Sequence, residues 1–309
     1  MANPVLSFDI FTNSSLSQLS ILELPFNYLT SLSTLSWMFN ISASLKRIDL
    51  ENNQLEGPIP NSFGELFFLE DLYLNHKKLH GGIPSSLRNL HNLEISSNEL
   101  NGLLPDNTTF SSLSRLYLGN NKLNAFHTQC LGQPLVLVHL DLSYNQLKRL
   151  PEGIEKLSNL RYLGMSSNLL EGELPNCWMN ISELCVLDLA NNKFSCKIPL
   201  TLGTLDQLEV LYLRGNNFIG ELPSTLRNCS GLRMLDVGGN KLTGNIPAWI
   251  GTHLTSLTVL SLRFNEFDGI MPSTICLLTN IHVLDLSRNN ISGRILRCLN
   301  NFTALVQKN

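Results

Sequence analysis

One pattern of residue types recurs along almost the whole chain, and few folds can accommodate it. Residues 208–223, LEVLYLRGNNFIGELP, show the unit: leucines at 208, 211 and 213, an asparagine at 216, then Gly220 and Pro223. The unit returns about every 24 residues, and self-similarity with such a period predicts a solenoid of stacked coils.

Each position of the unit has a physical role. Side chains alternate along a strand, so Leu211 and Leu213 should point into the core while Tyr212 and Arg214 point to solvent. Asn216 then turns the chain, and its amide offers a donor and an acceptor to backbone groups that the coil would otherwise bury unpaired. The sequence therefore predicts a short strand and an asparagine turn in every coil.

The turn position, an asparagine in every coil but one, recurs at intervals of 21 to 26 residues. We expect these residues to form a structural ladder at Asn27, Asn53, Asn98, Asn121, Asn145, Asn168, Asn192, Asn216, Asn240, Asn265 and Asn289. Lys77 takes the asparagine's place in one further coil, and its ammonium group has no acceptor. Leu296 stands where other coils have proline, and the coils of Asn27 and Asn121 lack the glycine-proline return segment, so we expect these four coils to be irregular.

The repeat predicts one elongated domain, although 309 residues would by length alone suggest two. A solenoid grows as each coil buries its leucines against its neighbours, so residues 16–309 should form a single repeat domain. Residues 1–15 should form a partial or irregular leading coil. Both ends stop in mid-pattern, so we expect the chain to be part of a longer protein.

The charge of the chain is modest. Charged residues make up 15% and the formal net charge is −3, which argues against a nucleic-acid partner. Residues 1–15 have neither the basic start nor the apolar run of a signal peptide. No stretch reaches the roughly 18 apolar residues of a membrane span.

Several phrases carry a family resemblance. The return segments resemble the plant-specific class of leucine-rich repeat, with L-x-G-x-I-P after the asparagine, at LEGPIPNSFGEL (55–66), FIGELPSTLRNCSGL (218–232) and LTGNIPAWIG (242–251). Three further phrases are similar to the ectodomains of plant receptor-like proteins of the elicitor and disease-resistance group: SWMFNISASL (36–45), LPNCWMNIS (174–182) and RCLNNFTALVQK (297–308).

This resemblance implies both a fold and a function. The fold would be an α/β solenoid of about twelve coils, a right-handed superhelix with a parallel concave β-sheet and an irregular or 3-10 convex side. The function would be recognition of a peptide or protein ligand at the plant cell surface, in immune or developmental signal perception. The parent protein would be anchored in the plasma membrane and would signal through partner receptor kinases.

The cysteines fit the repeat better than a bridge or a metal site. They recur on the return side of the coils, where small apolar residues pack into a core, and they form no C-x-x-C pair. We therefore expect packed thiols on the return side at Cys130, Cys177, Cys229, Cys276 and Cys298. Cys185 and Cys196 flank one strand and should lie too far apart to bridge.

Seven N-x-S/T sequons are candidates for glycosylation if the chain enters the secretory pathway. They lie at Asn13, Asn40, Asn107, Asn180, Asn228, Asn290 and Asn301.

No residue pattern predicts catalysis, a cofactor or a metal ligand. His76 and His80 have the spacing of a metal-binding helix, but they lie on a strand-to-turn segment and lack the adjacent glutamate. The segment 239–244 has phosphate-loop glycines, but Asn245 stands where lysine is required. We therefore predict a protein that is not an enzyme.

The candidate site is the concave surface. Outward positions near its start are acidic, at Glu23, Asp49, Glu51, Asp71 and Glu94, while the middle is aromatic, with Tyr117, His139, Tyr144 and Tyr162. Near the end an aromatic and basic group is expected to bind a carboxylate-bearing ligand: Tyr212, Arg214, Arg263, Phe264 and Arg288. The row of Asp49, Asp141, Asp188, Asp236 and Asp285 is interpreted as repeat consensus.

Two other functions remain open at this stage. A secreted leucine-rich repeat inhibitor of a microbial wall-degrading enzyme would carry capping cysteine pairs. An intracellular scaffold would explain the absent signal peptide. A membrane anchor encoded beyond Asn309 would distinguish the receptor from both.

Overall fold

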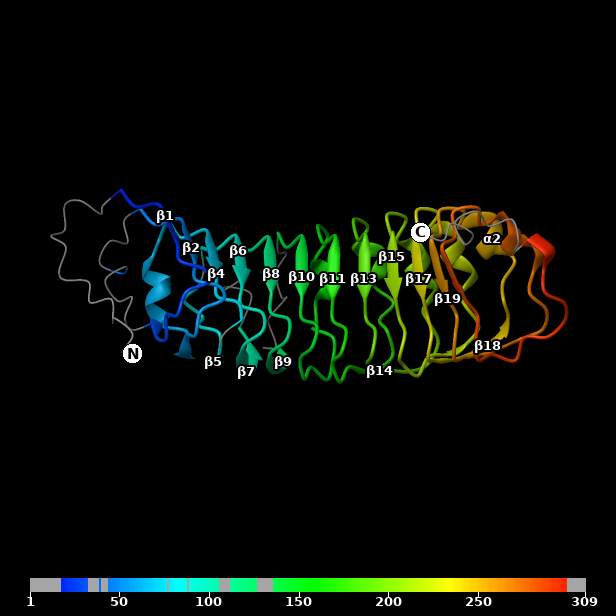
Figure 1. The fold of residues 1–309 in the computed structure, drawn as a ribbon, viewed down its shortest axis with the longest axis horizontal. Helices are drawn as coiled ribbons and strands as arrows, with labels where there is room; N and C mark the ends of the chain where they lie inside the picture. Colours follow the sequence, from blue (N-terminus) through cyan, green and yellow to red (C-terminus); the bar gives the residue numbers. More distant parts are fainter. Residues whose placement is uncertain are drawn as a thin grey trace.

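The computed structural model describes residues 18–32, 39, 44–76, 78–87, 89–105, 112–126 and 136–298. They form one elongated stack of coils, whose strands lie side by side along the long axis (Figure 1). The predicted solenoid of about twelve coils is thereby confirmed. The proposed leading coil, residues 1–15, lies outside the described residues.

One parallel sheet of twelve strands runs the length of the stack, with each strand pairing with the corresponding strand of the next coil. Its strands are β1 (Ile21–Glu23), β2 (Arg47–Asp49), β4 (Asp71–Tyr73), β6 (Asn92–Glu94), β8 (Arg115–Tyr117), β10 (His139–Asp141), β11 (Tyr162–Gly164), β13 (Val186–Asp188), β15 (Val210–Tyr212), β17 (Met234–Asp236), β19 (Val259–Ser261) and β21 (Val283–Asp285). The register repeats without a slip, so equivalent positions form rows across the sheet.

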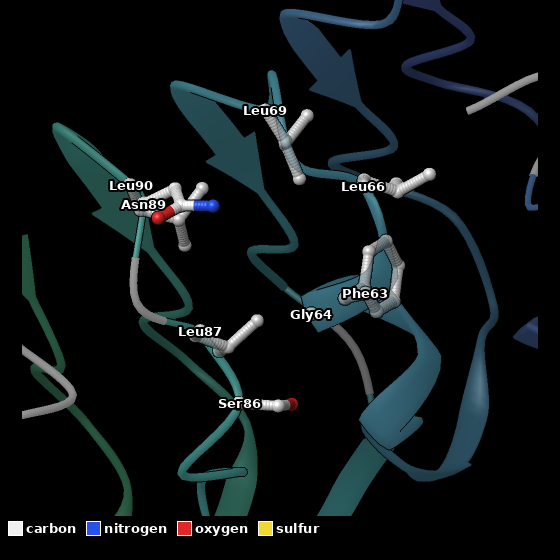
Figure 2. Close-up of a pocket in the computed structure, with 8 residues that line it drawn as sticks. All are labelled: Phe63, Gly64, Leu66, Leu69, Ser86, Leu87, Asn89 and Leu90. Atoms are coloured by element: carbon white, nitrogen blue, oxygen red, sulfur yellow. The ribbon is translucent and has the colours of Figure 1, made fainter. Parts of the chain in front are cut away.

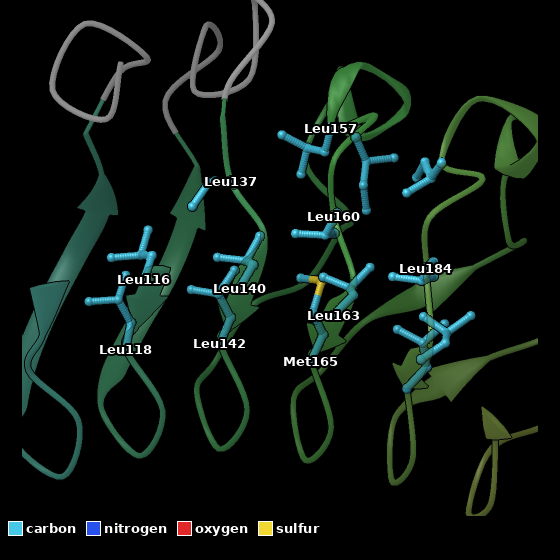
Figure 3. Close-up of a cluster of buried hydrophobic side chains, with 14 of the residues drawn as sticks. Leu116, Leu118, Leu137, Leu140, Leu142, Leu157, Leu160, Leu163, Met165 and Leu184 are labelled. Atoms are coloured by element: carbon cyan, nitrogen blue, oxygen red, sulfur yellow. The ribbon is translucent and has the colours of Figure 1, made fainter. Parts of the chain in front are cut away.

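The core lies between this sheet and the return side. In the interior coils the central residue of the strand and the first residue after the strand's end are buried. Leu116 and Leu118 show this at β8, and Leu163 and Met165 show it at β11 (Figure 3). Burying one such side chain contributes roughly 1.5–3 kcal/mol, so stacking the coils is the main source of stability.

The return side contains 3-10 helices, as predicted, and also short strands that the sequence did not predict. The strands form three small sheets: β3 (Glu56–Pro58), β5 (Lys78–Gly81), β7 (Glu99–Leu104) and β9 (Lys122–Phe126); β12 (Glu171–Gly172) and β14 (Lys193–Phe194); β16 (Ile219–Gly220), β18 (Lys241–Asn245) and β20 (Glu266–Asp268). The helices are η2 (Asn61–Glu65), η3 (Ile154–Lys156), η4 (Trp178–Asn180), η5 (Leu200–Thr204), η6 (Ser224–Asn228), η7 (Ser273–Leu277) and the α-helical turn α2 (Trp249–His253).

A glycine on the convex turns lets neighbouring coils approach closely. Gly64, eleven residues after Asn53, faces Ser86 of the next coil, and a Cβ at Gly64 would stand 2.7 Å from the Ser86 carbonyl oxygen (Figure 2). The cavity beside them holds only about 10 Å³, too little for a ligand. Gly203 against Thr225 and Gly251 against Thr274 repeat the contact.

The asparagine ladder is present as predicted. The Asn216 amide nitrogen donates to the carbonyl oxygens of Leu189 at 3.0 Å, Leu213 at 3.0 Å and Arg214 at 3.3 Å, and its oxygen accepts the Phe194 N–H at 3.1 Å. The side chain therefore joins its own coil to the preceding one.

The first ladder residue differs from the others. Asn27 is exposed and bonds only within its own coil, to the carbonyls of Leu24 and Pro25. Lys77 lies outside the described residues. The irregularity predicted for the coil of Asn121 is visible where β7 meets β9, because their register shifts between Gly102 and Leu103.

The prediction that the cysteines stay unpaired is wrong for two of them. Cys276 and Cys298 form a disulfide, with Cα atoms 5.7 Å apart. Cys276 stands eleven residues after Asn265 and Cys298 nine after Asn289, so the bridge replaces the glycine-to-serine or glycine-to-threonine contact of the other coils. Cysteines in these two rows face each other at a spacing that a disulfide requires.

The remaining described cysteines are free thiols. They are Cys177, Cys185, Cys196 and Cys229, so the prediction that Cys185 and Cys196 do not bridge is confirmed. Burial raises the pKa of the Cys229 thiol to about 11, which keeps it protonated and unreactive at neutral pH. Cys130 lies outside the described residues.

Candidate functional site: the concave surface

Three rows of side chains cover the concave face, at six, four and two residues before each ladder asparagine. The residue just before the asparagine forms the rim of the sheet and adopts a positive φ in every described coil. Other coils place Gly215, Gly239 or Asn191 there, residue types that tolerate this backbone. Tyr144, Phe264 and Arg288 occupy the same row with φ near 55° and exposed side chains, so the sequence accepts strain to keep large groups on the rim.

Three of the five residues in the predicted carboxylate site come together. The guanidinium carbons of Arg263 and Arg288 lie 5.3 Å and 4.8 Å from the centre of the Phe264 ring. Arg263 also pairs with Asp285, Nη1 to Oδ2, at 3.7 Å. A hydrogen bond from Ser287, helped by Arg263, lowers the pKa of the Asp285 carboxyl, which stays charged and holds Arg263 in place.

The other two residues are separate from this cluster. Gly238, two residues after β17, occupies the arginine row between Arg214 and Arg263, and the stem of Arg263 lies over it. Tyr212 donates its hydroxyl hydrogen to the Met234 sulfur at 2.9 Å. Arg214 is exposed and has no ion pair within the part of the chain that the structure describes.

An aromatic stack lies in the middle of the sheet. The His139 ring is 4.0 Å from the Tyr162 ring with the planes within 8°, and 4.5 Å from the Tyr117 ring. Burial lowers the pKa of His139, so its imidazole is neutral at pH 7. Burial and two nearby aspartates raise the pKa of Tyr162 to about 12. Tyr144 stands on the rim, outside this stack.

The acidic start of the surface contains an arginine that sequence reasoning missed. Arg47 Nε lies 3.0 Å from Glu23 Oε1, and its guanidinium carbon is 4.6 Å from the centre of the Tyr73 ring. Arg47 Nη2 also lies 3.9 Å from Asp49 Oδ2. Arg47 belongs to the row six residues before the ladder asparagine, so the sequence pattern could have revealed this residue. Its charge partly neutralises the acidic start of the surface.

The aspartate row has the structural role that the sequence suggested. One carboxylate oxygen of each residue accepts the backbone N–H two residues ahead, for example Asp141 from Ser143 at 2.9 Å and Asp188 from Ala190 at 3.0 Å. Asp49, Asp236 and Asp285 do the same. The second carboxylate oxygen faces an arginine in Asp49 and Asp285, where it lies 3.9 Å from Arg47 and 3.7 Å from Arg263.

Three sequons fall on the described surface, and all three asparagines are exposed. Asn180 and Asn228 end convex helices η4 and η6, while Asn290 follows the last ladder residue. Asn13, Asn40, Asn107 and Asn301 lie outside the described residues.

The remaining motifs show no catalytic arrangement. His76 and His80 are exposed, with His80 on strand β5, as predicted for solvent-facing residues. Within the described ranges, no group of three or more histidine, cysteine or acidic side chains is placed to hold a metal ion. No helix in those ranges is long and apolar enough to cross a bilayer.

Family models match most of the repeat region. Leucine rich repeat models cover residues 111–170 and 230–291, a two-copy leucine rich repeat model covers 182–228, and a single-repeat model covers 44–66.

Relatives and solved structures agree with these matches. Receptor-like protein EIX2 of Solanum lycopersicum is 39% identical over 37% of this chain, and the match spans only 14% of that protein. The ectodomain of the Arabidopsis receptor kinase HAESA, solved with the peptide hormone IDA and the co-receptor SERK1, superposes with a TM-score of 0.81 at 33% identity, over 92% of this chain and 48% of that one. The Arabidopsis receptor kinase GASSHO1/SCHENGEN3, in complex with CASPARIAN STRIP INTEGRITY FACTOR 2, superposes with a TM-score of 0.63 at 30% identity. The match covers 94% of this chain and 41% of that one.

Proposed function

Because this chain belongs to the leucine-rich repeat family, we propose that it is the ligand-recognition module of a plant cell-surface receptor-like protein. The module binds a peptide or protein on its concave sheet and has no catalytic activity of its own. The observation that carries the proposal is the continuous twelve-stranded face, whose outward rows hold aromatic and charged side chains. Such side chains dominate the binding energy of protein interfaces.

The similar structures support a peptide ligand and a partner kinase. HAESA and GASSHO1/SCHENGEN3 are each described in complex with a peptide ligand, and HAESA also with a co-receptor. By this analogy the parent protein acts in immune or developmental perception and signals through partner receptor kinases.

The disulfide supports an extracellular position. Bridges such as Cys276–Cys298 persist in oxidising compartments and are rare in the cytosol. The exposed sequons Asn180, Asn228 and Asn290 are then open to glycosylation. Both features favour a receptor on the outer side of the plasma membrane over an intracellular scaffold.

The proposed ligand contact is an anionic group at the cluster of Arg263, Phe264 and Arg288. Arg288 contacts the ring but has no ion pair within the described residues, so its guanidinium can grip a carboxylate. Arg214 with Tyr212 extends the surface towards Tyr162, Tyr144 and Tyr117. An extended peptide lying across the strands can reach both arginine groups.

Charge reversal tests this proposal. A library of short synthetic peptides ending in a free carboxylate is screened against the wild type, and binders are remeasured with an amidated end. The double variant Arg214→Glu, Arg263→Glu should abolish their binding, while Glu51→Lys at the far end should leave it nearly unchanged. The opposite result would move the site to the acidic end and make the ligand basic.

A further inference from the structure

The middle of the concave sheet combines the aromatic stack with two carboxylates. Asp141 lies on β10 and Asp188 on β13, on either side of Gly164 of β11 in the same row. Gly164 has no side chain, so the row has a gap between the two aspartates, which the Tyr162 ring partly covers. The tyrosine Cε1 and hydroxyl lie 2.9 Å and 3.0 Å from where a Cβ of Gly164 would be.

Asp141 is open towards the ligand side of the sheet. Its Oδ1 lies 3.0 Å from where a Cβ of Gly164 would be. Its Oδ2 lies 3.4 Å from where a Cβ of Gly119, in the preceding coil, would be. Glycines therefore stand beside this carboxylate at two positions, while its register partner on β8 is Tyr117. The Tyr162 hydroxyl and the Asp141 carboxylate thus converge above Gly164.

Neither carboxylate has an ion-pair partner among the described residues, unlike their equivalents at the two ends. Asp49 lies near Arg47 and Asp285 pairs with Arg263. Burial raises the pKa of the Asp188 carboxyl, while the hydrogen bonds from the Ala190 N–H and Ser166 and the charge of Arg214 act in the opposite direction. The positive side chain nearest to the stack is Arg115, opposite His139 in the register and exposed.

We propose that Tyr117, His139, Asp141, Tyr162 and Asp188 form a binding site for a cationic side chain, a guanidinium or ammonium group on the ligand. We name it the central cation site. The flat rings supply a π surface for the cation, and the two aspartates supply the opposite charge. The site rests on the proposed function, since it identifies the ligand chemistry on the same concave face, and it lies two strands or more from the cluster of Arg263, Phe264 and Arg288.

The two sites together specify a ligand of mixed charge. A cationic side chain would lie above Gly164 while an anionic group reaches the arginines near β19 and β21. Because the strands of a sheet are spaced about 4.8 Å apart, the ligand must run across the strands rather than along one coil.

The test uses a small probe, so it does not depend on knowing the natural ligand. A capped glycine pentapeptide with a central arginine is titrated into the protein, with the same peptide carrying neutral citrulline as the matched probe. Binding is read from the NMR signals of the His139 ring, which are assigned by their loss in His139→Gln. The arginine peptide should shift these signals and bind about tenfold more tightly than the citrulline peptide.

Matched variants separate charge from structure. Asp141→Asn and Asp188→Asn keep the oxygen that accepts the backbone N–H, so they should fold normally and weaken arginine binding about three- to tenfold. Asp236→Asn, in the same row but outside the site, should have no effect. Arg115→Gln removes a competing positive charge and should strengthen binding.

Equal binding of the arginine and citrulline peptides would overturn the central cation site, as would no shift of the His139 signals or full binding by Asp141→Asn. None of these outcomes affects the carboxylate screen, which uses different residues and different peptides. Loss of carboxylate binding with intact arginine binding would instead refute the proposed anionic contact alone.

Discussion

The ladder asparagines show how one side chain determines the geometry of a coil. Asn216 makes three donor contacts and one acceptor contact, and these connect two successive coils. No other side chain of its size offers both functions to buried backbone groups. Each bond replaces one that water would make in the unfolded chain, so its loss leaves carbonyl and amide groups buried without partners.

Replacing Asn216 with alanine should therefore destabilise the fold by about 1–3 kcal/mol. The measurement is the midpoint of thermal or urea unfolding followed by circular dichroism. Asn217→Ala is the matched control, because Asn217 is exposed and lies one position outside the ladder. A midpoint for Asn216→Ala equal to that of wild type would disprove this account of the ladder.

Tyr162 provides a second test at single-residue resolution. Its pKa is about 12 against an ordinary value of 10.0, so between these values the unfolded chain has lost the proton and the folded chain retains it. Stability is therefore unchanged below pH 10 and falls as the pH rises from 10 through about 12. Absorbance of the phenolate should show a late titration step that Tyr162→Phe removes. Titration of all the tyrosines together near pH 10 would contradict the packing of this ring.

At the level of the coil, the convex turns depend on contacts between two fixed rows. The residue eleven after one asparagine meets the residue nine after the next, as Gly251 meets Thr274 and Cys276 meets Cys298. In the first pair a glycine permits the contact, and in the second a covalent bond makes it.

Gly251→Ala should be strongly destabilising, because a Cβ would overlap the Thr274 carbonyl. Forcing an extra methyl group into such a contact typically costs about 1–3 kcal/mol. Gly231→Ala is the control, since its nearest neighbour, the Leu208 carbonyl oxygen, would stand 3.8 Å from the new Cβ. Comparable unfolding midpoints for the two variants would show that the coils can separate at little cost.

The same rows show what the sequence could and could not predict. The strands, the buried leucines and the ladder follow from one period, because each depends only on position within a coil. The bridge between Cys276 and Cys298 depends on which rows of adjacent coils meet on the convex side. The repeat period alone does not give the distance between two such rows. The sequence placed Tyr117, His139 and Tyr162 together in the aromatic middle but did not predict their stacking, since Tyr117 reaches diagonally past its register partner Asp141.

The molecule as a whole is a one-dimensional stack, so its stability should vary along its length. An interior coil is buried on both sides, whereas among the described strands β1 pairs with β2 alone and β21 with β19 alone. Leu284 of β21 and Leu286 just after this strand are accordingly only partly buried, while Leu260 of β19 and Leu262 just after it are fully buried. Opening should begin at the end coils and move inwards.

Native-state hydrogen exchange should reveal this gradient and also the effect of the disulfide. Exchange should be slowest around Asn192 to Asn240 and fastest in the coil of Asn27, where no covalent bond joins neighbouring described coils. The coil of Asn289 should be protected more than that of Asn27, because the bridge over 22 residues constrains its opening by about 3 kcal/mol. Cys276→Ser should remove this asymmetry, so that both ends exchange fast, whereas Cys177→Ser should not. Uniform protection from end to end in a monomer would contradict the one-dimensional picture, and an unchanged asymmetry in Cys276→Ser would show that packing alone stabilises the C-terminal coil.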